Sequence, residues 1–302
     1  MVDGDGQRIT HDMAMNKVEI LGRRFYLTPH GWQPSVTTLL KDTKPFKKVY
    51  WKKSLMEKGI TAHAATLYIE AYAEMKSITI DKALETVGAW VESPMPEEEA
   101  NTYMDWKKIS SSERGSSLHK FLEDTLPLRR ELTITEKPIA ADMLTNNLLE
   151  SLWKAEILQD ISMVNNVEKT TYWYNPSFGG GFAGTEDIDY VSRTLGRCRG
   201  DWKTKEPKKY SPTKFGSEHK LQVVAYAGAD ICNGGEQPDH LVVLYPFTDG
   251  SKAAMIKMNQ KEQKKCWDRF LLRVESWWDE YGQDWDLWNS IEQIAEDNKK
   301  PW

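Results

Sequence analysis

The chain has 302 residues, of which 40% are hydrophobic and 11% aromatic, so it can bury one large domain or a core with a helical elaboration. No run approaches the roughly 18 apolar residues of a membrane helix, and the polar N-terminus lacks a secretory or transit pattern, so we expect a cytoplasmic protein. The net charge of −5 decides little about a nucleic-acid partner, and three widely spaced cysteines argue against a disulfide framework or a metal cluster.

The first half of the chain is predicted to be mainly helical. Residues 18–27 are typical of a short hairpin, and Ser35 would be the N-cap of the helix that follows. Within residues 50–124 the apolar residues recur at helical spacing, with a break at residues 94–96. We therefore treat residues 1–110 as an N-terminal hairpin with a helical region.

The second half alternates between helical and strand patterns. Helices are expected at 137–159, 217–231 and 261–281, and strands at 167–174, 182–192, 198–204, 240–247 and 253–258. This order predicts an α/β core within residues 111–285. Residues 286–302 are expected to form an acidic C-terminal tail.

Two consecutive predicted strands carry carboxylates and a lysine. Alternation places Asp187 and Asp189 on one face of the first strand, and Asp201 and Lys203 on one face of the second. Carboxylates at one point can hold Mg²⁺ or Mn²⁺, which polarise a phosphoryl oxygen and lower the pKa of an attacking water. The lysine can orient that water and stabilise charge on the phosphate. The pattern therefore suits phosphodiester hydrolysis.

An ordinary structural explanation also exists for an isolated Asp-x-Lys, which is usually a solvated strand face with a cross-strand pair. Two features favour a catalytic interpretation. Gly184 and the polar residues after it are poor choices for a core strand, and Asp201 follows at hairpin distance. We therefore predict a metal-binding hairpin.

Two helices carry further candidate residues. His119 lies at the edge of an apolar stripe, where a lone histidine is commonly a packing residue but can be a third metal ligand beside carboxylates. Gln222 and Tyr226 are four apart and share one helical face. They are either the polar edge of an amphipathic helix or contacts to phosphate and nucleic acid.

Basic residues interleave with aromatic ones at residues 44–53, which include Lys52 and Lys53, and again at residues 106–108. A charge run of this kind is commonly a solvated helix face. It can equally contact the backbone of a single strand by charge and stack its bases on the rings. Both interpretations stay open at this point.

Four separated motifs occur in the order found in RecB-type exonuclease domains of the PD-(D/E)XK superfamily. They are Arg114-Gly115-x-x-x-His119, Gly184-x-x-Asp187, Asp201-x-Lys203-Thr204 and Gln222-x-x-x-Tyr226. The residues around these motifs, with the early segment 34–40 and Trp51, resemble the group that holds the mitochondrial genome-maintenance exonuclease and related bacteriophage exonucleases. The likeness spans residues 31–272.

The resemblance implies a restriction-endonuclease-like core, a small mixed sheet flanked by helices, with the N-terminal elaboration forming an arch that threads a free single strand. It implies catalytic roles for Asp187, Asp201 and Lys203. The implied metal ligands are His119, Asp187, Asp201 and the backbone carbonyl of Trp202. The implied DNA contacts are Arg114, Ser35, Thr204, Gln222, Tyr226, Lys52 and Lys53.

We therefore expect a monomeric, Mg²⁺- or Mn²⁺-dependent DNA exonuclease that favours single strands or free ends. It would act in phage-type DNA replication, recombination or degradation, in the cytoplasm of a bacterial host. Two alternatives remain: a non-catalytic DNA-binding recombination protein on a nuclease fold, and a structure-specific endonuclease. The joint presence of His119, Asp187, Asp201 and Lys203 argues against the first alternative.

Overall fold

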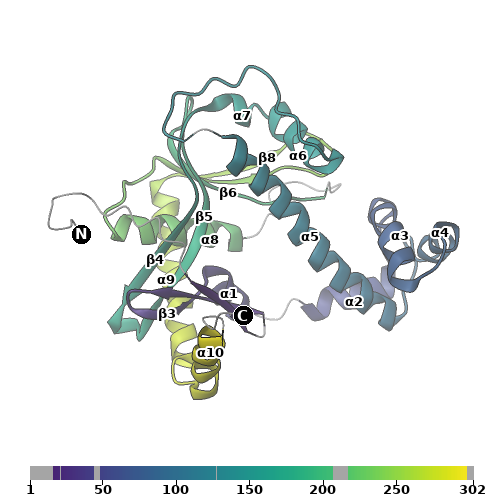
Figure 1. The fold of residues 1–302 in the computed structure, drawn as a ribbon, viewed down its shortest axis with the longest axis horizontal. Coiled ribbons are helices and arrows are strands. Elements are labelled where there is room, and N and C mark those ends of the chain that lie inside the picture. Colours follow the sequence, from purple (N-terminus) through teal and green to yellow (C-terminus); the bar gives the residue numbers. More distant parts are fainter. Residues whose placement is uncertain (1–15, 21, 44–47, 127, 207–216, 298–302) are drawn as a thin grey trace. The chain divides into compact units, whose positions relative to one another are not determined.

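The computed structural model describes residues 16–20, 22–43, 48–126, 128–206 and 217–297 (Figure 1). The chain divides into two compact units. Unit 1 comprises Met1–Thr43 and Ser117–Trp302, and unit 2 comprises Lys44–Ser116. Unit 2 is thus an insertion into the chain of unit 1, and each unit is described by itself below.

A five-stranded mixed sheet forms the centre of unit 1, in the order β4-β5-β6-β7-β8. Its strands are β4 (Ile161–Asn175), β5 (Gly180–Ser192), β6 (Gly196–Trp202), β7 (His240–Tyr245) and β8 (Ala254–Met258). Neighbouring strands are antiparallel except β6 and β7, which are parallel and joined through helix α8 (Ser217–Cys232). A parallel pair needs such a crossover, because a tight turn reverses the chain direction and would make the two strands antiparallel.

Helices flank the sheet, and β7 shows how both faces are buried. Leu241, Val243 and Tyr245 pack into a core with α8 and α9 (Gln260–Tyr281). Val242 and Leu244, which alternate with them, pack into a second core with the end of α5 (Glu97–Thr125), α6 (Met143–Lys154) and α7 (Ile157–Asp160). A continuous apolar run is what a strand buried on both faces requires. The α/β prediction is confirmed at this level.

The N-terminal residues form a small three-stranded sheet, β1 (Lys17–Ile20), β2 (Arg23–Thr28) and β3 (Gly31–Pro34), followed by α1 (Val36–Asp42). The predicted hairpin is present, and β3 was not predicted. Ser35 caps α1 by accepting a hydrogen bond from the Thr38 N–H, as predicted. Phe25 and Leu39 are fully buried in the core of α8 and α9. The sheet therefore belongs to unit 1, which differs from the predicted grouping of residues 1–110.

Unit 2 consists of α2 (Lys48–Lys58), α3 (Ala62–Lys76), α4 (Ile80–Gly88) and the first part of α5. Its core is rich in aromatic rings, with Tyr68 in contact with Tyr72, Tyr103 and Trp106. The predicted break at residues 94–96 separates α4 from α5. The threading arch stays a prediction.

The C-terminal region is an ordered helix up to Asp297, and residues 298–302 lie outside the described part. Helix α10 (Trp285–Asp297) buries Leu287, Ile291 and Ala295 in the same core as α9. These residues are four apart, so they form one stripe among acidic neighbours. The segment predicted as an acidic tail is therefore helical over residues 285–297. Nowhere in the described chain is a helix both long and apolar enough for a membrane crossing.

Candidate metal centre

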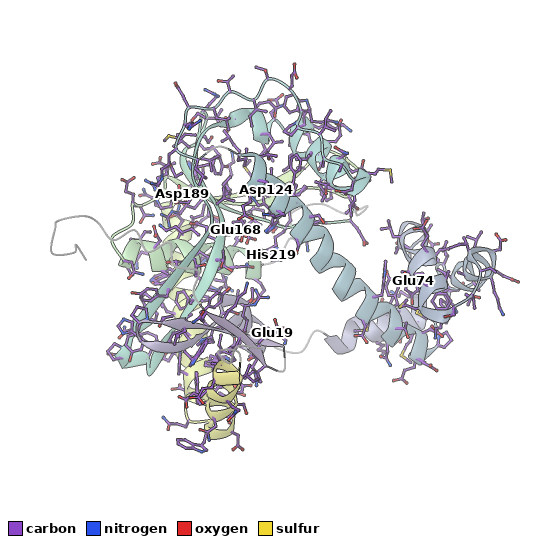
Figure 2. All side chains as sticks on the ribbon, in the orientation of Figure 1. Glu19, Glu74, Asp124, Glu168, Asp189 and His219 are labelled. Atoms are coloured by element: carbon purple, nitrogen blue, oxygen red, sulfur yellow. The ribbon has the colours of Figure 1, made fainter. Side chains whose placement is uncertain are left out.

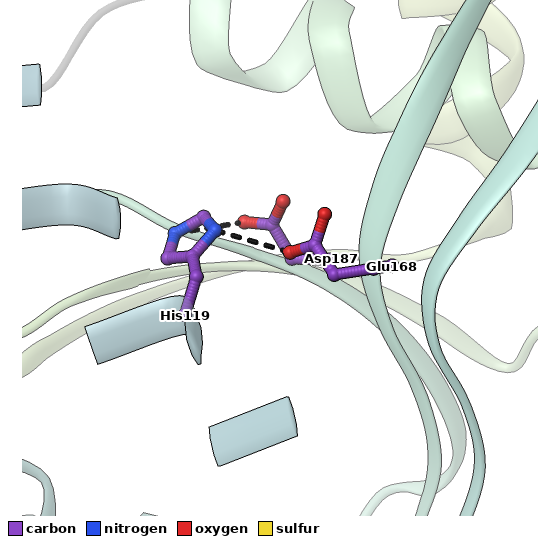
Figure 3. Close-up of side chains that lie close together, drawn as sticks. All are labelled: His119, Glu168 and Asp187. Carbon is purple, nitrogen blue, oxygen red and sulfur yellow. Dashed lines mark hydrogen bonds and ion pairs between the residues drawn. The ribbon is translucent and has the colours of Figure 1, made fainter. Parts of the chain in front are cut away.

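Three side chains from different elements of unit 1 converge at one point (Figure 3). His119 comes from α5, Glu168 from β4 and Asp187 from β5. The Nδ1 atom of His119 lies 3.2 Å from Glu168 Oε1, and its Nε2 atom lies 3.5 Å from Asp187 Oδ2. The Trp202 carbonyl oxygen lies 3.4 Å from the same Nε2. One possible ligand atom from each of the three side chains lies within 4.8 Å of the other two, and 24% of the His119 and 32% of the Glu168 side chain is exposed.

Local packing explains the placement of His119 and Asp187. Leu118 and Leu122 bury α5 in the core, which leaves His119 at the edge of that stripe. The regular register between β5 and β6 ends at the pair Ile188 and Gly200. Beyond it, the Trp202 N–H donates to Asp187 Oδ2 at 2.7 Å, so the side chain takes the place of a strand partner. The site lies where β5 and β6 diverge.

Glu168 has an unusual backbone, with φ of 50° in the middle of β4. A non-glycine residue in the left-handed region costs about 1–2 kcal/mol, and such residues concentrate at functional sites. The strand alternation is also interrupted here. Glu186 and Asp189 are three residues apart, yet both contact Arg199. The sequence pattern gave no signal for Glu168, since alternation assumes an uninterrupted pleat.

Asp201 and Lys203 form an ion pair beside this cluster, in which 23% of the Lys203 side chain is exposed. Asp201 is fully buried; its Oδ1 accepts from Gln222 Nε2 at 3.2 Å, and its Oδ2 lies 2.5 Å from Lys203 Nζ. Burial and the charge of Asp187 raise the pKa of Asp201 to about 7. Burial lowers the pKa of Lys203, but the charges of Asp201 and Asp187 outweigh it and raise that pKa overall. The lysine is therefore held as an ammonium.

Helix α8 supplies a row of polar side chains on the side that faces the sheet. Gln222 Nε2 also approaches the Tyr226 hydroxyl at 2.9 Å, and a Cβ at Gly184 would lie 2.4 Å from the Tyr226 ring. Glycine at 184 is thus needed for Tyr226 to pack on β5. One turn before Gln222, the His219 ring lies 3.0 Å from the Tyr245 hydroxyl. His219, labelled in Figure 2, was not singled out in the sequence, where nothing distinguished it.

Asp187 and Asp189 do not share partners, so the prediction that alternation sets them on one shared face is wrong. Asp189 Oδ2 lies 2.9 Å from Arg197, and its Oδ1 accepts from Asn165 at 2.8 Å. Asp189 therefore belongs to a buried ion network, away from the partners of His119. The interrupted pleat between residues 186 and 189 is the physical reason.

Among the remaining predicted DNA contacts, only Ser35, Lys53 and Thr204 have side chains that the structure describes. Ser35 bonds within its own helix cap, and Lys53 lies 3.7 Å from Glu57 within unit 2. The Thr204 hydroxyl is shielded from solvent and has no hydrogen-bond partner in the described residues. The side chains of Arg114 and Lys52 lie outside the described residues.

The donor set fits a hard divalent cation. Imidazole, carboxylate and carbonyl donors together suit Mn²⁺ or Mg²⁺ where oxygen ligands dominate. Burial lowers the pKa of His119, but its hydrogen bond to Glu168 and the charges of Asp187 and Glu168 raise that pKa to about 9. Asp201 Oδ2 has no hydrogen-bond partner of good geometry in the described part of the chain. The centre thus gathers negative charge that a cation would neutralise.

Comparisons with known proteins place few limits on this chain. No protein-family model and no curated protein matches the sequence. Among solved structures, the chain is similar to that of SSO0001, with 13% sequence identity over 79% of this chain and 82% of that one. The TM-score is 0.28, which is too low to establish a shared fold.

Replacing Asp187 and Asp189 separately should give opposite phenotypes. We expect Asp187→Asn to abolish binding of Mn²⁺ at the centre while changing the melting temperature little, because the amide keeps an oxygen for the Trp202 N–H and removes a buried charge. Asp189→Asn should keep the metal site but lower stability by about 1–3 kcal/mol, because Arg197 loses a buried charged partner. Calorimetric titration with Mn²⁺ and thermal melting measure the two effects. Equal metal affinity in the two variants would contradict the assignment.

Proposed function

We propose that the protein is a divalent-metal-dependent deoxyribonuclease of the PD-(D/E)XK type, with Mg²⁺ or Mn²⁺ as cofactor. The convergence of His119, Glu168 and Asp187 beside the ion pair of Asp201 and Lys203 carries the proposal. A cluster of carboxylates and a histidine next to a lysine held as an ammonium is an arrangement suited to cleaving a phosphodiester bond.

Each residue has a role in the proposed reaction. His119, Asp187 and the Trp202 carbonyl would hold the cation, Asp201 would contribute its Oδ2, and Glu168 would add an oxygen that the sequence motifs did not predict. The bound cation would polarise a phosphoryl oxygen and acidify the attacking water. The ammonium of Lys203 orients that water and stabilises the charge that develops on the phosphate. Gln222 fixes the orientation of the Asp201 carboxylate.

The substrate and the mode of attack rest on the four motifs of RecB-type exonucleases. They support a monomeric exonuclease acting on single-stranded DNA or free ends, in phage-type replication, recombination or degradation. A non-catalytic DNA-binding protein is the alternative, and a complete set of site residues with Lys203 in place speaks against it. An endonuclease would use the same centre on internal bonds.

A time course with end-labelled DNA tests the proposal. Single- and double-stranded DNA labelled at the 5′ or the 3′ end is incubated with Mg²⁺ or Mn²⁺, with EDTA as the control. We expect mononucleotides or short products from linear DNA, none with EDTA, and no cut in circular single strands. Cleavage of the circle identifies an endonuclease instead. Tight DNA binding without metal-stimulated cleavage would support the non-catalytic alternative.

A further inference from the structure

Beyond Glu168, the side chains of β4 separate into two rows. Lys169 pairs with Asp230 of α8, and Thr171 and Trp173 are buried, so these odd-numbered residues face α8 and α9. The even-numbered residues Tyr172 and Tyr174 are half-buried on the opposite face. Neither tyrosine belongs to a hydrophobic core cluster. Their rings are therefore not explained by packing.

The even-numbered row leads directly from the metal centre. Glu168 belongs to it and contacts His119 of α5. At the rise of a strand, Tyr172 lies about 13 Å and Tyr174 about 20 Å from Glu168 along β4. Their register neighbours on β5 are Ala183 and Gly181, which are too small to cover the rings. Glu168, Thr170, Tyr172 and Tyr174 are all partly exposed, so the row is a track that solvent reaches.

A third ring extends the track from the small sheet. His30 is exposed at the turn between β2 and β3, and its ring stacks on Tyr174 with centroids 4.3 Å apart and planes 7° apart. It also lies 6.0 Å from the Tyr172 ring. The stack fixes the orientation of Tyr174 without enclosing it. Residues far apart in the sequence thereby form one surface, which contains three aromatic rings. We call it the β4 track and define it as Glu168, Thr170, Tyr172, Tyr174 and His30.

We propose that the β4 track binds single-stranded nucleic acid, with bases stacked on Tyr172, Tyr174 and His30 and the backbone running toward the metal centre. Unpaired bases stack on partly exposed aromatic rings of this kind. Such stacking shows no sequence preference, because every base has a flat face. In a duplex the base faces are already stacked on one another, so the track favours single strands. This inference rests on the proposed function and adds the surface on which its single-stranded substrate would lie.

Binding is tested in the full-length Lys203→Ala protein, so that cleavage does not interfere. The probe is a fluorescent oligo(dT) strand with Mg²⁺ present, and affinity is read from fluorescence anisotropy. We expect Tyr172→Ala and Tyr174→Ala each to weaken binding about 5- to 150-fold, the range that one base–aromatic stack contributes. Tyr172→Phe should bind like its parent, since the ring is kept. Trp285→Ala, which removes a ring that is 74% exposed on α10, is the matched control.

The outcomes separate this inference from the proposed function. If wild type cleaves DNA and the tyrosine-to-alanine variants bind and cleave like Trp285→Ala, the β4 track is overturned and the nuclease stands. If wild type cleaves nothing but loss of either ring weakens binding, the nuclease fails and the track stands. Failure of the parent to bind oligo(dT) overturns the track. Tyr172→Leu and Tyr174→Leu keep apolar bulk, so a loss of affinity with an unchanged melting temperature excludes misfolding.

Discussion

The Lys203→Ala protein should lose metal-dependent DNA cleavage, with the rate falling by about 10³-fold or more. Lys203 Nζ lies 2.5 Å from Asp201 and is held as an ammonium by the charges of Asp201 and Asp187. Removing a charge-stabilising or proton-handling group from such a centre typically costs 10²- to 10⁴-fold in rate. Initial rates on end-labelled single-stranded DNA at saturating Mg²⁺ measure the effect.

Two controls isolate the role of that ammonium. Lys257→Ala removes an exposed lysine on β8, and its rate should equal that of wild type. Lys203→Met keeps the length of the side chain without its charge, so it should be as inactive as the alanine variant while packing better. A Lys203→Ala protein that retained a tenth of the wild-type rate would contradict the assignment of Lys203.

Arg199→Leu should cause the largest loss of stability of any single substitution in the ion network. Arg199 is 1% exposed and lies among three carboxylates, Glu186, Asp189 and Asp230. Breaking a buried network by removing one partner costs about 3–5 kcal/mol, because the remaining charges stay buried without compensation. For a unit of this size the melting temperature should fall by about 10 °C. Arg269→Leu, an exposed arginine on α9, is the control and should melt like wild type.

The loss of stability in Arg199→Leu should be greater at high pH than at low pH. Burial raises the pKa of Glu186 to about 8, even though the charge of Arg199 lowers it. A folded-state pKa above the unfolded value means that this group's contribution is intact at low pH and is lost as the pH rises through about 8. Without the charge of Arg199, the folded-state pKa of Glu186 should rise further. Thermal melting of wild type and Arg199→Leu at pH 5.5 and pH 8.5 tests this. A difference in melting temperature between the two proteins that is the same at both pH values would argue against the network.

Local patterns predicted much of the core and part of the centre. Alternation and turn signals located β5, β6 and β7, and helical spacing located α8 and α9. Asp201 and Lys203 could be placed together because they are two residues apart on one predicted strand, although β6 itself ends at Trp202. His119 could be placed because the apolar stripe of its helix fixes which side faces the sheet. These are short-range regularities, and the fold preserves them.

The features that the sequence did not predict depend on long-range or irregular geometry. Glu168 joins the centre only because its backbone leaves the regular pleat, and no local rule predicts that. β4 begins at Ile161, six residues before the predicted strand, because β5 pairs with the polar residues around Asn165 and Asn166. The contact between Asp187 and the Trp202 N–H arises where two strands part. Pairing across the chain, not residue preference, decides these features.

The left-handed backbone at Glu168 also bears on how this chain could evolve. Glycine adopts that conformation without steric cost, so variants with glycine at this position would gain about 1 kcal/mol in folding. In a population selected for thermal stability alone, glutamate should be replaced there. Selection for the proposed metal-dependent cleavage should retain it, because the Glu168 carboxylate lies 3.2 Å from His119 Nδ1. Position 168 is where the two selective pressures would oppose each other most directly.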